Sequence, residues 1–191
     1  SSVYGDSETL PKVETMHTNP KSPYALTKYS GEAYLKLFYK LYGLETLSIR
    51  YFNVFGPRQD PNSEYSAVIP KFIKMIKEDK QPIIFGDGLQ SRDFSYITNV
   101  VNANLLAADA KETKGEIINV ACGTRINLIE LVDKLNILLG KNLKPIFKDE
   151  RKGDVKHSLA DIKKAKELID YSPLIDIDEG LKLTVESFEN N

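Results

Sequence analysis

The chain has 191 residues, of which 41% are hydrophobic and 28% are charged, and its formal net charge is −1. This balance is typical of a globular protein with a real core. It provides no basic excess for binding nucleic acid or an anionic membrane. No apolar stretch approaches the roughly 20 residues of a membrane span. The single Cys122 cannot form an internal disulfide, and His17 and His157 are too few for a metal site, so we expect a cytoplasmic protein without a metal.

A helix is the first element that the sequence predicts. Ser22 is a good N-cap and Pro23 suits the first helical position, so we place the helix from there to about Tyr42. Gly43 is its expected C-terminal stop. Residues 46–56 follow as a β-rich run whose mixed pattern suits a strand buried on both faces.

The later elements alternate between helices and strands. We predict helices over about 68–78, from an Asn99 cap to about Ala110, and from near Asn127, Asp161 and Asp178 onward. Strands are predicted at 82–86, 92–97 and 116–121. This alternation implies an α/β fold with a mainly parallel sheet.

Tyr24 and Lys28 stand four residues apart near the start of the first helix. Positions i and i+4 of a helix lie one above the other, about 6 Å apart. A free tyrosine, with a pKa near 10, is a poor base at neutral pH, and a nearby ammonium favours the phenolate. The pair therefore predicts a proton-transfer unit. The alternative is an ordinary Tyr-Lys pair on a solvated helix face.

Several ordered motifs surround this pair, namely SSVYGD, SPYALTKYSGE, RYFNVFGPRQDPN, AVIPKFI, IFGDGLQSRDFSYI and KGDVKHSLADIKKA. Together they resemble the extended short-chain dehydrogenase/reductase superfamily, specifically its NAD-dependent nucleotide-sugar epimerases. The closest resemblance is to the UDP-glucose/UDP-N-acetylglucosamine 4-epimerases.

The resemblance implies the C-terminal part of a Rossmann-type doubly wound parallel sheet plus a smaller α/β substrate-binding domain. Residues 1–56 would be the remaining part of the NAD-binding domain, and residues 57–191 the UDP-sugar-binding region. Parts of 90–122 would pack back on the Rossmann sheet.

The same resemblance implies roles for individual residues. Tyr24 and Lys28 would be catalytic and would contact NAD, and Phe52 would pack near the nicotinamide. The substrate contacts would be Asn53, Val68, Arg92, Arg151, Asp154 and Ser158. Guanidinium forks suit the two phosphates of a UDP group, and an Asn at the carboxyl end of a strand suits a ligand. The alternatives are surface ion pairs for the arginines, a turn for Asn53 and a core position for Phe52.

The implied reaction inverts C4 of a UDP-hexose through a 4-keto intermediate. Related 4,6-dehydratases carry Asp-Glu, and decarboxylases a Glu in the second position, where this chain has Ser1 and Ser2. A serine hydroxyl is too weak an acid or base for those reactions, so the epimerase is favoured. The chain has no GxxGxxG fingerprint, and the family's catalytic Ser or Thr would precede Ser1. We therefore expect an incomplete enzyme that does not turn over alone. The alternatives are a non-catalytic nucleotide-sugar binding module and another epimerase or dehydratase of the superfamily.

Two further expectations concern assembly and the sugar. The first helix carries apolar residues on more than one face: Tyr29, Ala33, Tyr34, Leu37, Phe38 and Leu41. In the resembling family this helix pairs with its partner's, so we expect a homodimer unless these residues all face their own core. Ser158 stands four residues after Asp154, where resembling enzymes restricted to UDP-glucose and UDP-galactose carry a bulky Tyr. A small residue predicts room for a 2-N-acetyl group unless another side chain closes the gap.

Overall fold

The computed structural model describes residues 1–62, 67–150 and 155–189. Its helices are η1 (Ser2–Tyr4), α1 (Pro23–Tyr42), α2 (Val68–Lys77), α3 (Ile97–Asp109), α4 (Leu128–Leu139), α5 (Lys163–Ile169) and α6 (Ile177–Glu189). Its strands are β1 (Leu47–Tyr51), β2 (Val54–Phe55), β3 (Ile83–Phe85), β4 (Ser91–Arg92), β5 (Ser95–Tyr96), β6 (Glu116–Val120), β7 (Ile126–Asn127) and β8 (Ile146–Lys148).

Most strands pair in parallel, as the alternation of strands and helices predicts. Strand β1 pairs with β6 over its full length, from Leu47 opposite Glu116 to Tyr51 opposite Val120. The pairs β2–β5 and β3–β8 are also parallel, whereas β4–β7 is antiparallel. The predicted α/β class is confirmed.

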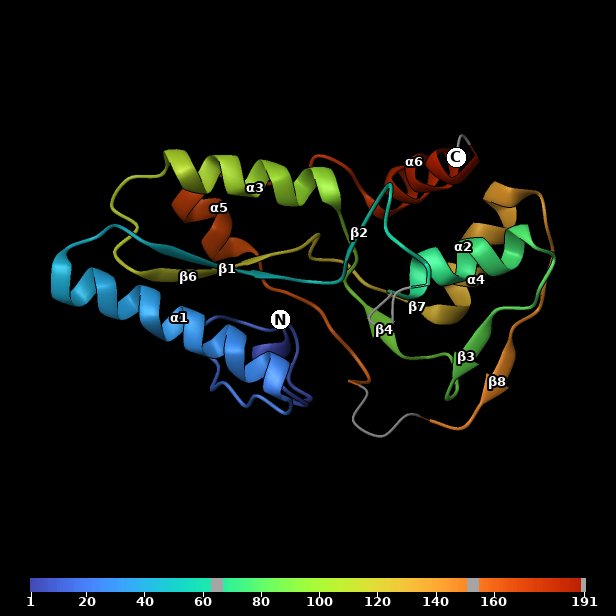
Figure 1. The fold of residues 1–191 in the computed structure, drawn as a ribbon, viewed down its shortest axis with the longest axis horizontal. Coiled ribbons are helices and arrows are strands. Elements are labelled where there is room, and N and C mark those ends of the chain that lie inside the picture. Colours follow the sequence, from blue (N-terminus) through green and yellow to red (C-terminus); the bar gives the residue numbers. More distant parts are fainter. Residues whose placement is uncertain (63–66, 151–154, 190–191) are drawn as a thin grey trace.

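The elements gather in two parts (Figure 1). One part holds the β1–β6 pair with α1 on one side and α3 and α5 on the other, the arrangement of a doubly wound sheet. The other part holds α2, α4 and α6 with β3 and β8. Both α3 and β6 come from the 90–122 region and lie with β1. The domain boundary at residue 56 itself stays a prediction.

The second part has a core built from amphipathic helices. In α2, Ile69, Phe72, Ile73 and Ile76 recur at helical spacing and are all buried. They pack against buried side chains of α4 and α6, namely Leu128, Leu131, Val132, Leu135, Leu181 and Val185.

Helix α1 begins and ends where its capping residues predict. The Ala25 backbone N–H donates to Ser22 Oγ at 3.1 Å, and Pro23 occupies the first helical position. Gly43 ends the helix with a φ of 66°, and its N–H donates to the Tyr39 carbonyl at 2.9 Å. The capping residues therefore fix the position of this helix along the chain.

Two predicted boundaries are wrong for physical reasons. The strand expected over 46–56 breaks at Asn53, whose φ of 32° lies outside the extended region. Asn99 does not cap α3, which begins two residues earlier at Ile97. Its buried side chain instead accepts hydrogen bonds from the backbone N–H groups of Leu174 and Ile175.

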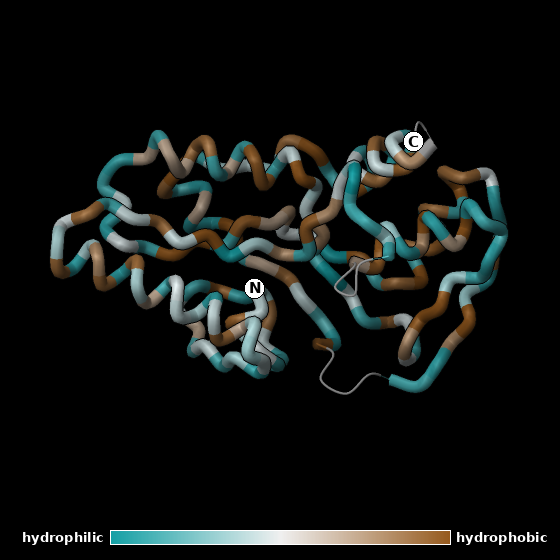
Figure 2. The backbone as a smooth tube through the Cα atoms, viewed as in Figure 1, coloured by the Kyte–Doolittle hydropathy of each residue, from teal (hydrophilic) through white to brown (hydrophobic). Residues whose placement is uncertain are grey.

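The surface of α1 is unusually apolar. Figure 2 shows hydrophobic residues recurring along this helix, although only Ala25 of its residues is buried. Tyr34 and Leu41 are 65% and 64% exposed. Among the residues described, no helix has both the length and the apolar composition needed to cross a membrane.

Candidate active site

Three cavities adjoin one another along the described chain. The α1 cavity has a volume of about 430 Å³, the junction cavity about 260 Å³ and the α2 cavity about 450 Å³. Ser1 and Ser2 line both the α1 cavity and the junction cavity. Asn53 and Arg92 line both the junction cavity and the α2 cavity. The shared residues place these cavities side by side, and we call the three together the recess from α1 to α2.

Tyr24 and Lys28 line the α1 cavity, at one end of this recess. The Lys28 Nζ lies over the Tyr24 ring, 5.1 Å from its centroid. The Tyr24 side chain is 62% exposed, so nothing in the described chain covers the phenol. The predicted pairing of a phenol and an ammonium on one helix face is therefore present, and their catalytic role stays a prediction.

Asn53 and Ser158 meet in the wall of the junction cavity. The Asn53 Nδ2 donates to Ser158 Oγ at 3.0 Å and to the Asp93 carbonyl at 3.0 Å. These two bonds turn the Asn53 side chain toward the segment around Ser158, which explains why the backbone accepts a positive φ there. Two predicted substrate residues, 105 positions apart, thus touch each other.

Asp93 organises the residues around this wall, and sequence reasoning missed it. Its carboxylate is fully buried and accepts hydrogen bonds from the N–H groups of Cys122, Gly123 and Ala160 at 3.0, 3.1 and 3.2 Å. Its own N–H donates to Ser158 Oγ at 3.4 Å. Burial raises the pKa of Asp93 to about 6, although the three backbone bonds oppose the shift.

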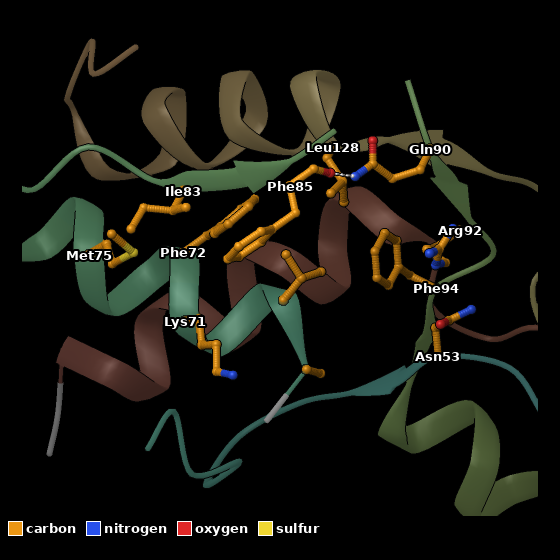
Figure 3. A pocket seen from close by; sticks show the side chains of 12 residues that line it. Asn53, Lys71, Phe72, Met75, Ile83, Phe85, Gln90, Arg92, Phe94 and Leu128 are labelled. Carbon is orange, nitrogen blue, oxygen red and sulfur yellow. Dashed lines mark hydrogen bonds between the residues drawn. The ribbon is translucent and has the colours of Figure 1, made fainter. Parts of the chain in front are cut away.

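Arg92 lines both the junction cavity and the α2 cavity, and Figure 3 shows it beside Phe94 and Asn53. Its Nη1 donates to the carbonyls of Ser91 and Lys156, both at 3.0 Å, which holds the guanidinium at this point. Val68 opens α2 and lines the α2 cavity. Arg151 and Asp154, the other predicted substrate contacts, lie outside the described residues.

The α2 cavity itself is mostly apolar. The rings of Phe72, Phe85 and Phe94 line it, and Lys71 and Arg92 add cationic groups (Figure 3). Sequence reasoning missed these aromatic residues and Lys71, because their pattern resembles that of ordinary core positions. A recess that is apolar at one end and cationic beside it suits a flat base carrying a diphosphate.

Phe52 and Lys12 line the junction cavity. Phe52 is fully buried and packs on Tyr4, with 6.2 Å between ring centroids, so the core alternative holds and its place near a nicotinamide stays a prediction. Lys12, which the sequence did not single out, is 2% exposed and donates to the Ser7 carbonyl. Burial lowers the pKa of this ammonium.

The α1 cavity fits one end of a dinucleotide cofactor. Lys28 offers ammonium donors to ribose hydroxyls, Tyr24 opens into the same cavity, and Gly31 leaves clear space, with no atom within 4 Å of where a Cβ would lie. The given sequence carries no glycine-rich fingerprint for the pyrophosphate. These residues therefore fit the nicotinamide-ribose end of NAD.

The sequence and the fold both match known proteins. The model of the "NAD dependent epimerase/dehydratase family" matches residues 1–121. The structure of UDP-N-acetylglucosamine 4-epimerase from Methanobrevibacter ruminantium M1 in complex with UDP-N-acetylmuramic acid is 44% identical, with a TM-score of 0.95 over 100% of this chain and 61% of that one.

Two further solved structures are similar. UDP-glucose 4-epimerase from Thermotoga maritima with UDP-glucose is 40% identical, with a TM-score of 0.93 over 99% of this chain and 60% of that one. UDP-glucuronic acid 4-epimerase from Bacillus cereus in complex with UDP-glucuronic acid and NAD is 34% identical, with a TM-score of 0.90 over 100% and 59%. The chain spans about 60% of the length of the first curated relatives it matches. The expected Rossmann-type fold and NAD as the family's cofactor are confirmed.

Proposed function

Because this chain belongs to the NAD dependent epimerase/dehydratase family, we propose that it is part of an enzyme that inverts C4 of a UDP-hexose. The observation that carries the proposal is the recess that runs from Tyr24 and Lys28, past Asn53, to Arg92. Such a recess suits a substrate whose sugar reacts at one end and whose nucleoside diphosphate is anchored at the other.

Each residue has a defined task in this proposal. Tyr24 takes the proton from the sugar 4-hydroxyl and later returns one, and the Lys28 ammonium stabilises the phenolate that forms. NAD, which Tyr24 and Lys28 would hold, would supply the hydride chemistry at C4. Tyr24 and Lys28 also contact this cofactor, and Phe52 stands near its nicotinamide.

The substrate is held by residues farther along the recess. Asn53 orients the sugar, and Arg92 and Arg151 grip the diphosphate, as guanidinium forks grip paired phosphate oxygens. Val68 borders the nucleoside, and Asp154 binds the uridine ribose. This grip keeps the nucleotide in place while the 4-keto sugar turns over to present its other face.

We propose that the sugar is UDP-N-acetylglucosamine or UDP-N-acetylgalactosamine, alongside the non-acetylated pair. Support comes from Ser158, whose small side chain lines the junction cavity and is drawn into the wall by its bond from Asn53. Similar structures hold UDP-N-acetylmuramic acid, UDP-glucose and UDP-glucuronic acid, so relatives differ in the sugar they bind.

Two alternatives compete with this proposal. The first is a nucleotide-sugar binding module that performs no catalysis. Tyr24 and Lys28 in the α1 cavity oppose it, because binding alone does not require this pair. A decarboxylase or dehydratase of the same superfamily is the other, and curated relatives include both kinds. Ser1 and Ser2 at the edge of the junction cavity oppose it, because neither hydroxyl can act as the second acid or base.

One experiment separates these functions. The full-length protein is incubated with UDP-N-acetylglucosamine or UDP-glucose, and the products are followed by proton NMR. The proposal predicts the C4 epimer of at least one sugar and no loss of water or carbon dioxide. Binding of either UDP-sugar without any product would instead support the binding module.

A further inference from the structure

The row of residues formed by Tyr24 and Lys28 continues for one more turn of α1. Glu32 follows Lys28 by four residues, so the three side chains lie in line on one face of the helix. All three line the α1 cavity. The proposed reaction uses the first two and leaves Glu32 without a task.

Glu32 forms a two-pronged ion pair with Arg50 of β1. The Arg50 Nε donates to Glu32 Oε1 at 2.8 Å, and its Nη2 donates to Glu32 Oε2 at 2.7 Å. The two side chains are 3% and 10% exposed, so the pair is almost fully buried. Two parallel hydrogen bonds between planar groups fix direction as well as distance.

Arg50 also contacts the short helix η1. Its Cζ lies 4.6 Å from the centroid of the Tyr4 ring, a cation–π contact. The Tyr4 hydroxyl donates to Asn119 Oδ1 of β6 at 2.7 Å. Ser2, in the same short helix, lines both the α1 cavity and the junction cavity. Arg50 therefore joins α1, the sheet and the wall between these two cavities.

Helix α1 has few other attachments in the part of the chain that the structure describes. Ala25 is its only buried residue there. No α1 side chain other than Glu32 hydrogen-bonds to a different element within those same residues. The Thr46 Oγ1 donates to the Leu35 carbonyl of α1 at 2.9 Å, and the Glu32–Arg50 pair adds a second, directional attachment that restricts the rotation of α1 over β1.

Stability alone does not account for this pair. A buried ion pair replaced by apolar residues of similar volume is often neutral or stabilising, because desolvating the charges is costly. Here the desolvation cost includes that of burying the Arg50 Nη1, which has no hydrogen-bond partner among the described residues. The two directional hydrogen bonds between Arg50 and Glu32, by contrast, hold the helix in a defined orientation.

We propose that Glu32 and Arg50 are positioning residues that hold the Tyr24 phenol and the Lys28 ammonium in register with a sugar bound in the junction cavity. This inference rests on the proposed function. Because a misplacement of 1 Å at a reacting centre can lower a rate about a hundredfold, loosening α1 should affect turnover more than binding.

The test uses a double variant of the full-length protein, Glu32→Leu with Arg50→Met. Removing both charges avoids leaving one buried charge unpaired, so we expect the fold to be kept. We expect kcat for C4 epimerisation to fall roughly 10- to 100-fold while KM stays within about twofold. Arg50→Lys, which keeps the charge and loses the fork, should fall between the double variant and the wild type.

A matched control removes an ion pair elsewhere. Lys134 of α4 and Asp178 of α6 pair at 2.5 Å, with side chains 34% and 66% exposed. The double variant Lys134→Met with Asp178→Asn should keep both kcat and KM. This control shows whether a fall in kcat follows the loss of any ion pair between elements or only the loss of the Glu32–Arg50 pair beside the reacting groups.

Hydrogen exchange of α1 provides a readout that does not depend on turnover. In the Glu32→Leu, Arg50→Met variant, amides of α1 should exchange faster than in the wild type, and those of α4 should not. If the wild type epimerises and the double variant keeps its kcat, the positioning role is overturned and the proposed function stands. If the wild type does not epimerise, the proposed function fails. Separately, if the amides of α1 exchange no faster in the double variant than in the wild type, the pair does not anchor this helix.

Discussion

Ser158 is the residue whose size sets the sugar that we expect. Its Oγ receives the hydrogen bond from Asn53 in the wall of the junction cavity. Ser158→Tyr should abolish turnover of the acetylated sugars and keep that of UDP-glucose, because a phenol ring fills the space of an acetamido group. The measurement is kcat/KM for both sugar pairs. Ser158→Ala is the control and should accept both, and an equal loss on both pairs in Ser158→Tyr would show that this residue is no gate.

The hydrogen bonds that the buried Asp93 carboxylate accepts lead to a prediction about stability. Asn at this position has one acceptor oxygen for three backbone N–H groups, and each buried N–H left without a partner costs about 1–3 kcal/mol. Asp93→Asn should therefore lower the free energy of unfolding of the full-length protein. Denaturant titration measures this change directly.

The loss of unfolding free energy in Asp93→Asn should depend on pH, and the direction follows from the pKa of Asp93. The folded Asp93 carboxyl, with its pKa raised from the ordinary value of 3.8 to about 6, keeps its proton to a higher pH than the unfolded one. Its contribution to stability is therefore largest at low pH and is lost as the pH rises through 6. Asp93→Asn should destabilise the protein by roughly 1 kcal/mol more at pH 5 than at pH 7.5.

Asp87 provides a matched control for the pH dependence expected of Asp93→Asn. It is an exposed carboxyl whose pKa is lowered, mainly by the hydrogen bond from the Leu89 N–H. The loss in Asp87→Asn should thus be no greater at pH 5 than at pH 7.5. The same pH trend in both variants would contradict the account of Asp93.

At the scale of elements, the exposed face of α1 is the surface that we propose for a homodimer. Tyr34, Leu37, Phe38 and Leu41 are 45–65% exposed in the described chain, which matches a helix that packs against a second copy. Phe38→Glu with Leu41→Glu should shift the full-length protein from dimer to monomer in sedimentation at micromolar concentration. Leu105→Glu in α3, at a residue that is 62% exposed, should remain a dimer. A wild-type monomer would contradict the proposal.

Elements with local signals could be predicted, and elements defined by distant contacts could not. The cap at Ser22 formed as expected, and the helix expected from near Asn127 begins there with a capping box of Asn127 and Glu130. Both signals depend on neighbouring residues. At Asn53 the local pattern offered a turn only as an alternative, and the bond that holds the strand break is donated to Ser158, 105 residues away. All three residues of the short strand β8 are exposed, with Ile146 at 43% and Phe147 at 52%, so it shows no alternation of burial that would have predicted it.

At the scale of the whole molecule, the sequence predicted the fold through its ordered motifs, and it predicted only part of the recess. Tyr24, Asn53 and Arg92 line successive cavities as a substrate-binding path requires. Asp93 and Arg50, which hold this recess together, were missed. A single buried carboxylate or guanidinium has no sequence pattern, because its role depends on which segments the fold brings around it.

The proposed function depends most on Tyr24. General acid–base catalysis contributes about 10²- to 10⁴-fold to a rate. Tyr51 also lines the α1 cavity, but it lies on β1 and its hydroxyl donates to Asn104. Tyr24, by contrast, lies beside Lys28 on the helix. The decisive measurement is kcat for C4 epimerisation by Tyr24→Phe in the full-length protein, beside calorimetric binding of UDP and a Tyr29→Phe control. The account predicts at least a hundredfold loss of kcat with unchanged UDP affinity in Tyr24→Phe, and no loss in the control. Turnover by Tyr24→Phe close to that of the wild type would contradict it.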